Sequence, residues 1–420
     1  MGMPLARMKG FRRLTKVADA LEIVLKESSK VRVGGEVISA ENAFGRVLAE
    51  DVVSQYDVPP YDRAAVDGYA IRSEEALSAS QSNPAIFRVV GTVGAGGGQW
   101  KVGSNEAVEI YTGGVMPEGT DAVAMAEDCE RKGDEVLVLR AVPKYANVSR
   151  KGEDIKRGEV VFRKGHLLKA WDIGVLLSIR MREVAVRSRL KVAILSTGSE
   201  LVEISDPKAL DGWSVVDSTR PMIKALLAQA GCEVVDGGIV QDSLEEIRDR
   251  LTKLAEGADL LITIGGTSVG GRDLVPEALE GVQGSRLLFH GIAAKPGKPL
   301  GFGLYIGKPL FMLPGYPVSA LVGYESFIEL TISSITGFPR RERRRVKARL
   351  SRRVPTSPGI RHFLRVTLEG EGDGLMAKPI ALTGSGLLSS VTKADGMVII
   401  AEDKEGLEEG EEVEVELLGD

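Results

Sequence analysis

The sequence predicts a multidomain protein that combines an α/β domain with several β-rich segments. The chain has 420 residues, which is more than one ordinary domain holds. Residues 190–335 alternate continuous apolar strands with amphipathic helices, the pattern of a parallel sheet that helices cover on both faces. Short strands separated by glycine-rich turns occupy residues 85–140 and 346–420.

Composition and charge exclude several classes of protein. Hydrophobic residues make up 43% and charged residues 27%, which is typical of a folded chain and excludes extended disorder. The net charge of −5 disfavours a general nucleic-acid binder. The two cysteines and three histidines are scattered and form neither a zinc pattern nor a disulfide framework. Because we find neither a signal peptide nor a membrane span, we expect a cytoplasmic protein without membrane or nucleic-acid partners.

The first part of the chain predicts a domain with another domain inserted into it. Residues 14–30 place apolar side chains at helical spacing and predict an amphipathic helix. Residues 148–187 mix short strands with one apolar helix and return to the character of the first segment. We therefore predict a helical N-terminal domain of residues 1–56 and 148–187, interrupted by an inserted β-rich domain of residues 57–147.

The α/β domain is predicted over residues 188–338 as a doubly wound parallel sheet. Its helices have recognisable ends, with Ser243 as the N-cap of one and Gly231 closing another. The expected strands lie at 191–196, 232–240, 259–266, 286–290, 299–306 and 309–313, and the expected helices at 219–231, 243–257 and 317–335.

Residues 346–420 predict a small C-terminal β-barrel domain. The strongly basic run 339–353 precedes and overlaps it, and we interpret this run as a solvated connector. A contact with nucleic acid is the alternative. The acidic residues of 408–418 alternate with apolar ones, so they are expected on the solvent face of a strand.

Four loops of the α/β region carry the candidate chemistry: STGSEL (196–201), GGTSVGGRD (265–273), KPGKP (295–299) and LPGYP (313–317). The first two directly follow buried strands, and open parallel sheets bind ligands beyond the carboxyl ends of their strands. Glycines let backbone N–H groups approach an anion, and hydroxyls add donors. Neither a P-loop nor a dinucleotide fingerprint is present. Carboxylates and lysines around such loops indicate a phosphate or oxyanion held with a divalent cation.

Each charged candidate also has a purely structural interpretation. Glu200 could be an exposed turn residue, and Asp273 could cap the helix that follows it. Lys295 and Lys298 could be solvated, and Asp67 could form a turn. Reasoning from the residues alone therefore stops at an enzyme that acts on a phosphorylated ligand and has an oxyanion site.

Taken together, the motifs resemble the molybdopterin molybdenumtransferase family, which includes MoeA and the E-domain of gephyrin. Some positions depart from the family pattern: Arg63-Ala64 stands where Asn-Ser is common, and Val66 replaces Met. Ser199 and Tyr316 replace the Asp of STGDEL and the Asn of LPGNP. The matching stretches follow the family order and are PPYDRAAVDGYAIR (59–72), YTGGVMPEGTDAV (111–123), RKGEDI (150–155), the four loops above, FLRV (363–366) and GSG (384–386).

The resemblance implies the four domains above, with the α/β domain binding molybdopterin. It implies an elongated homodimer whose active sites each lie between the α/β domain of one subunit and the inserted domain of the other. The implied reaction inserts molybdate into adenylylated molybdopterin and releases AMP with the assistance of Mg²⁺. Molybdopterin adenylyltransferase is the expected protein partner.

The resemblance also implies roles for individual residues. Glu200, Asp273 and Asp67 are the catalytic candidates, and the first two would hold Mg²⁺ or activate water. Lys295, Lys298, Arg365 and Ser385 are expected to bind molybdate or a nearby phosphate. The other substrate-binding candidates are Thr112, Asp154, Thr197, Gly198, Gly265, Gly266, Ser268, Gly270 and Pro314.

Three alternatives to molybdate insertion remain open at this stage. Tungstate has the charge and nearly the size of molybdate, so the sequence does not distinguish the two oxyanions. A non-enzymatic scaffold of the gephyrin kind would not need the retained carboxylates and lysines. Adenylyl transfer by the α/β domain alone would not need the segments 59–155 and 346–420.

Overall fold

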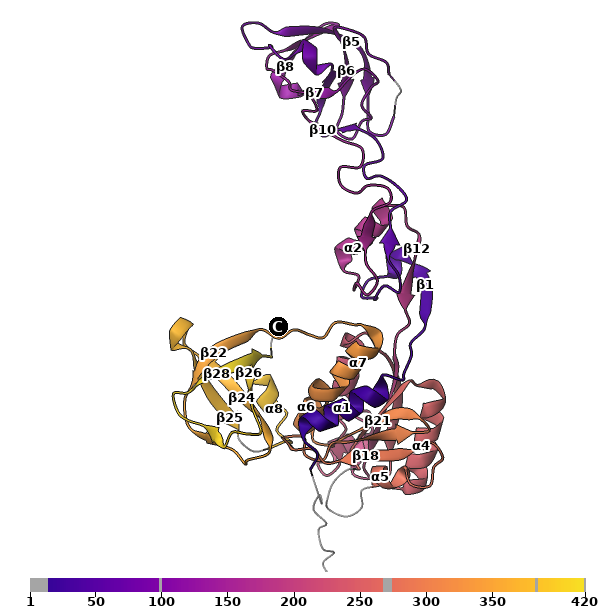
Figure 1. The fold of residues 1–420 in the computed structure, drawn as a ribbon, viewed down its shortest axis with the longest axis vertical. Helices are drawn as coiled ribbons and strands as arrows, with labels where there is room; N and C mark the ends of the chain where they lie inside the picture. The colour runs from indigo at the N-terminus through magenta and orange to yellow at the C-terminus, as the bar shows by residue number, and fades with distance from the viewer. Residues whose placement is uncertain (1–13, 98–99, 267–273, 382–383, 419–420) are drawn as a thin grey trace, which may run out of the picture. The chain divides into compact units, whose positions relative to one another are not determined.

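The structure, a computed structural model, describes residues 14–97, 100–266, 274–381 and 384–418. The chain divides into two compact units, of which one contains Met1–Glu36 and Arg187–Asp420 and the other Val37–Val186. The α/β region, the β-rich regions and a closed C-terminal barrel are present, as the sequence predicts (Figure 1). The four domain boundaries stay a prediction.

A six-stranded sheet forms the centre of the α/β region, in the order β16-β13-β17-β21-β20-β18. The first four of these strands are parallel to one another, whereas β20 is antiparallel to both of its neighbours. The sheet is therefore mixed, and the prediction of a wholly parallel sheet is wrong at this edge. The bounds are β13 (Lys191–Thr197), β16 (Glu233–Val240), β17 (Leu260–Ile264), β18 (Arg286–His290), β20 (Gly301–Tyr305) and β21 (Lys308–Leu313).

A two-residue turn explains the antiparallel strand. Ile306 and Gly307 join β20 to β21 and have φ values of 50° and 77°, as a type I′ hairpin requires. A parallel connection would need a crossover of a dozen or more residues, usually through a helix. The short link therefore forces the chain to turn back on itself.

Helices cover both faces of this sheet, which confirms the doubly wound arrangement (Figure 1). Alternate residues of β13 contribute to two separate cores: Val192 and Ile194 to one, Ala193 and Leu195 to the other. The predicted cap Ser243 accepts a hydrogen bond from the Glu246 N–H at the start of α4. The first face carries α1 (Val17–Ser28), α3 (Thr219–Gln229), α6 (Pro317–Gly323), a π-helical turn (Tyr324–Ile328) and α7 (Glu329–Thr336), and the second carries α4 (Leu244–Gly257) and α5 (Leu274–Ala278).

Helix α1 packs differently from the sequence-based expectation. The sequence predicts it as part of the N-terminal domain, whereas Val17, Ala20 and Val24 lie in the core of the α/β region. The Thr15 backbone N–H donates to the Gly291 carbonyl and anchors the start of the helix there. Its apolar spacing predicts the helix correctly, but spacing does not encode which surface the apolar stripe covers.

The unit Val37–Val186 contains a six-stranded sheet in the order β7-β4-β6-β5-β9-β8, with an apolar cluster on each face. A separate core surrounds Leu48, Leu168 and Leu176 and includes the helix α2. The bounds are β4 (Gly68–Ile71), β5 (Ala85–Val93), β6 (Glu106–Ile110), β7 (Ala122–Met125), β8 (Cys129–Lys132), β9 (Glu135–Val138) and α2 (Ala170–Ser178); short strands occur at β1 (Gly35–Ser39), β2 (Val52–Val53), β3 (Arg63–Ala64), β10 (Val148–Ser149), β11 (Val160–Phe162) and β12 (Glu183–Arg187).

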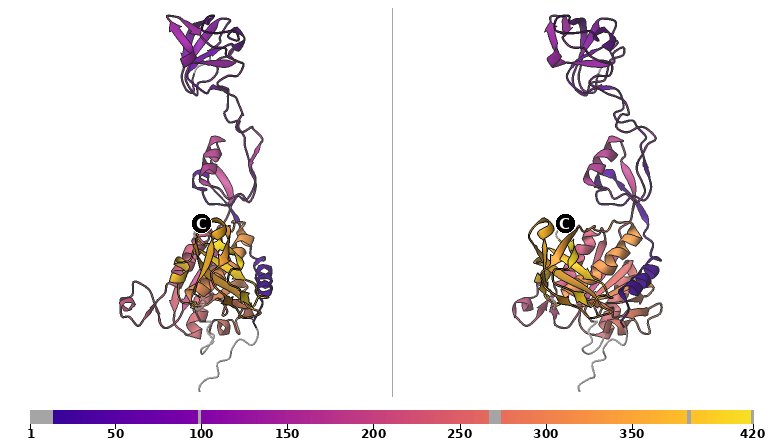
Figure 2. Two further views of the ribbon diagram at one scale, coloured as in Figure 1. Left: turned by 90° about the vertical axis from the view of Figure 1, so that its left-hand side faces the viewer. Right: turned by 60° about the vertical axis from the view of Figure 1, so that its left-hand side comes forward.

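The C-terminal domain is a closed five-stranded barrel, because β24 pairs with both β25 and β26 (Figure 2). The two-residue strand β19 (Ala294–Lys295) of the α/β region adds to the same sheet. Lys295 lies opposite His362 in a parallel pairing. The barrel strands are β22 (Arg345–Leu350), β24 (Arg361–Glu369), β25 (Met376–Ala381), β26 (Gly396–Ile400) and β28 (Glu412–Leu417).

The basic run 339–353 enters the barrel as strand β22, and acidic residues of β28 face its cations. Arg345 forms an ion pair of 2.7 Å with Glu416, and Lys347 one of 2.8 Å with Glu412. These pairs favour the connector interpretation, because acidic side chains of the neighbouring strand β28 balance the positive charges of β22. Among the residues that the structure describes, no helix has the length and apolar character to cross a membrane.

Phe311 offers a test of the α/β core. It is fully buried, and its ring centroid lies 4.9 Å from that of Phe302. We expect Phe311→Ala to lower the free energy of unfolding by about 3–5 kcal/mol, since it leaves a cavity between the sheet and its helices. Urea denaturation measures this loss, and Leu287→Ala, at a position 44% exposed, is the control. Equal effects of the two substitutions would contradict the packing described here.

Candidate active site

Three neighbouring parallel strands, β13, β17 and β21, end at the same edge of the sheet. The loops that follow them line a cavity of about 960 Å³, here called the strand-end cavity. The predicted residues on its wall are Thr197, Gly198, Glu200, Gly265, Gly266 and Pro314. Parallel pairing thus brings together the loops STGSEL and LPGYP and the described start of GGTSVGGRD.

Two glycines allow the loop after β17 to lie against the end of β13. Gly265 and Gly266 have φ values of 89° and 64°. A Cβ atom on Gly265 would lie 2.4 Å from the Thr197 carbonyl oxygen, and one on Gly266 would lie 2.6 Å from Thr197 Oγ1. The Thr197 hydroxyl is buried and has no hydrogen-bond partner among the described residues.

The carboxylates of the strand-end cavity differ in what they contact. Asp217 is held by the buried guanidinium of Arg220, whose Nε donates to Asp217 Oδ2 at 2.9 Å. Glu200 lies exposed in the turn after β13, and Asp242 lies exposed after β16. The Asp242 backbone N–H donates to Ser199 Oγ, which connects these two loops.

Asp242 was missed by the sequence analysis. It lies just after Gln241 at the end of strand β16, so the rule for the other strand ends could have found it. The predicted residues Ser268, Gly270 and Asp273 lie outside the described residues.

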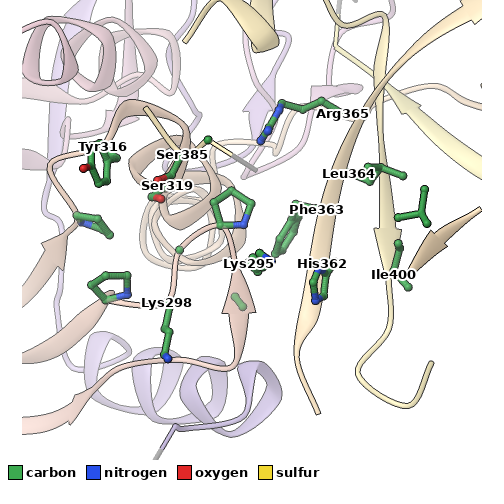
Figure 3. A pocket seen from close by; sticks show the side chains of 17 residues that line it. Lys295, Lys298, Tyr316, Ser319, His362, Phe363, Leu364, Arg365, Ser385 and Ile400 are labelled. Carbon is green, nitrogen blue, oxygen red and sulfur yellow. The ribbon is translucent and has the colours of Figure 1, made fainter. Parts of the chain in front are cut away.

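A second cavity, of about 300 Å³, lies beside the first and is here called the basic cavity (Figure 3). It brings together the four predicted oxyanion residues Lys295, Lys298, Arg365 and Ser385. They come from β19, from the turn after it, from barrel strand β24 and from the loop 384–386. Pro299, Pro314 and Tyr316 line both cavities and form their shared wall.

Positive charge dominates the basic cavity. Arg365 is only 3% exposed, and burial lowers the pKa of its guanidinium, which still remains protonated. Burial, together with the neighbouring charge of Lys295, also lowers the pKa of His362, so this imidazole is neutral at physiological pH. Figure 3 shows the Lys298 side chain extending away from Arg365. The cavity is suited to an anion.

The remaining predicted residues lie in the other unit. Asp67 Oδ1 accepts hydrogen bonds of 2.7 Å from both the backbone N–H and the hydroxyl of Thr112. These bonds, the backbone bond foremost, hold the pKa of Asp67 below its ordinary value. The carboxylate is therefore ionised and oriented. Asp154 lies exposed in the turn 150–155.

Comparison with known proteins covers nearly the whole chain. Residues 15–179 match the family model "MoeA N-terminal region (domain I and II)", residues 193–333 "Probable molybdopterin binding domain", and residues 347–418 "MoeA C-terminal region (domain IV)". A Methanocaldococcus jannaschii protein whose name refers to molybdopterin biosynthesis is 37% identical over 96% of both chains. The molybdopterin molybdenumtransferase of Staphylococcus aureus is 32% identical over 95% of this chain and 94% of its own length.

Solved structures show the same relationship. A crystal structure of the molybdopterin biosynthesis MoeA protein of Pyrococcus horikoshii superposes with a TM-score of 0.77 at 34% identity. The match covers 96% of this chain and 100% of that one. With all three family regions present in order and relatives matched over nearly their full length, this chain belongs to the MoeA family of molybdopterin molybdenumtransferases.

Proposed function

We propose that this enzyme of molybdenum cofactor biosynthesis inserts molybdate into adenylylated molybdopterin and releases AMP. The observation that carries the proposal is the pair of adjoining cavities. One offers carboxylates and glycine-rich strand ends, and the other offers three cations. A substrate that carries a phosphoanhydride and must meet an oxyanion requires both environments side by side.

The strand-end cavity suits hydrolysis of the phosphoanhydride. The Thr197 hydroxyl and the backbone at Gly265 and Gly266 would hold a phosphate. Glu200 would accept the proton of the attacking water, whose oxygen forms the new bond to phosphorus as AMP leaves. The basic cavity would hold molybdate through Lys295, Lys298, Arg365 and Ser385 until the two dithiolene sulfurs bind molybdenum and one oxo ligand leaves as water with the two thiol protons.

The described residues fit a magnesium ion that the substrate helps to bind. No group of three or more His, Cys, Asp or Glu residues could hold a metal within the ranges that the structure describes. Mg²⁺ usually binds through one or two carboxylates together with substrate phosphates and water, and Glu200 and Asp242 offer such oxygens. Asp273 is the further ligand that the family resemblance implies. When bound, the ion would neutralise phosphate charge and activate water.

A homodimer with shared active sites completes the proposal. The oriented carboxylate of Asp67 is suited to act on a ligand, and in the proposed dimer it would face the α/β domain of the partner subunit. The substrate would come from molybdopterin adenylyltransferase.

The proposed function is tested by anaerobic turnover of adenylylated molybdopterin with molybdate or tungstate. AMP release and cofactor formation are followed by chromatography. We expect Glu200→Gln to slow AMP release on the order of 10²-fold, since it removes the proton acceptor. Glu245→Gln, on the exposed face of α4, is the control. A wild-type rate of AMP release in Glu200→Gln would exclude the role of Glu200 as proton acceptor. If the native protein forms no cofactor in this assay, the proposed function is excluded.

The oxyanion pocket is tested separately by the dependence of turnover on molybdate. Lys298→Ala and Arg365→Ala are each expected to raise the half-maximal molybdate concentration about 10- to 100-fold, the cost of a charge-assisted hydrogen bond. Lys253→Ala, at an exposed lysine of α4, is the control. If the molybdate dependence is unchanged and substrate affinity collapses instead, these residues bind the pterin phosphate.

The shared site is tested by mixing two inactive variants. Asp67→Ala and Asp273→Ala should each be inactive alone, and subunit exchange should restore about one intact site per heterodimer. Activity of the mixture is compared with that of each variant incubated alone. A monomeric mass by light scattering at the assay concentration would contradict the arrangement.

A further inference from the structure

The wall shared by the two cavities consists of ring side chains, although charged groups line the cavities on either side. It consists of Pro299, Pro314 and Tyr316. A ligand that extends from the strand-end cavity into the basic cavity must pass along these three rings. Tyr316 is 63% exposed despite its central position, so one face of its ring is open to such a ligand.

The backbone of Tyr316 is fixed at the start of α6, and its ring contacts the loop 384–386. Its carbonyl accepts the Ala320 N–H at the start of α6, and Pro317 follows it as the first residue of that helix. A Cβ atom on Gly386 would lie 3.3 Å from Tyr316 Cδ1, so the ring packs directly over this glycine. The Val318 N–H donates to the Ser385 carbonyl at 3.1 Å and ties the two loops together. The ring therefore offers a preorganised surface.

We propose that Tyr316 is a specificity-determining residue whose ring stacks on the fused pterin ring of the substrate where the two cavities meet. The proposal rests on the proposed function for the identity of the substrate. Flat nitrogen heterocycles stack well on tyrosine. Because the Tyr316 ring is neutral, it can position the pterin without competing with the charged groups of the two cavities for the anions.

The adenine of the substrate shares this flat heterocyclic chemistry, but the pterin fits the position better. The dithiolene sulfurs that receive molybdenum are carried by the ring fused to the pterin. Pterin and oxyanion must therefore lie within a few bonds of one another. The adenine is separated from that ring by two phosphates, which belong with the strand-end cavity. Tyr316 lines both cavities, so its ring lies between the place of the oxyanion and that of the phosphates, where the pterin is required.

Binding of two simple probes to the full-length protein tests the proposal. The fluorescence of 6-hydroxymethylpterin reports pterin binding, and calorimetry reports AMP binding. Tyr316→Ala is expected to weaken pterin binding roughly 5- to 100-fold, the range for loss of one stacking platform. Tyr316→Phe keeps the ring and should bind like the native protein. Trp213→Ala, which removes an aromatic side chain 91% exposed and outside both cavities, is the matched control.

Gly386→Ala provides a second variant, which displaces the ring without removing it. It should weaken pterin binding less than Tyr316→Ala does. In turnover, Tyr316→Ala should raise the KM for adenylylated molybdopterin while the molybdate dependence stays unchanged.

The outcomes separate this proposal from the proposed function. Unchanged pterin binding in Tyr316→Ala, or no pterin binding by the native protein, would overturn the stacking role. Loss of AMP affinity with pterin affinity intact would assign the ring to adenine and overturn the pterin assignment. If the native protein binds pterin through Tyr316 but forms no cofactor, the stacking role stands and the proposed insertion reaction fails.

Discussion

The basic cavity depends on one short backbone pairing, that of β19 with the barrel strand β24. Lys295 lies opposite His362 in this pairing, and the Arg361 N–H donates to the Ala293 carbonyl at 2.9 Å. Together with the hydrogen bond from the Val318 N–H to the Ser385 carbonyl, this pairing holds Arg365 of the barrel beside the two lysines. Backbone hydrogen bonds are directional and fix register, so a pairing of only two residues is sufficient to position cations from two domains around one cavity.

The division of charge between the cavities follows from which carboxylates are already neutralised. Arg220 is buried and contacts Asp217, Asp236 and Glu203, so the charge of Asp217 is compensated beneath the strand-end cavity. Glu200 and Asp242 remain exposed at its wall. Because the cations of the basic cavity lie beyond an apolar wall, opposite charges are kept apart until a ligand connects them. Such an arrangement favours a substrate that has an anionic group for the basic cavity and that binds a cation together with the carboxylates of the strand-end cavity.

The sequence by itself determined the kinds of element and the chemical groups of the site. Continuous apolar runs predicted the buried parallel strands β13, β17 and β21, and the strand-end rule then identified Thr197, Glu200 and the glycines after them. Asp242, which follows β16, satisfies the same rule but is absent from the predicted residues. The alternating tail predicted β28 with its acidic residues on the wet face. These inferences succeed because periodicity and turn chemistry are local properties of the chain.

Only the tertiary structure decided which surfaces and loops meet. The stripe of α1 packs into the α/β core, although its spacing would suit any apolar surface. The direction of β20 depends on the positive φ values of Ile306 and Gly307, and isoleucine does not signal such a conformation. The placement of Tyr316 between the cavities depends on Gly386, a residue far away in sequence. Contacts between distant segments are set by packing and backbone pairing over the whole domain, and no local pattern encodes them.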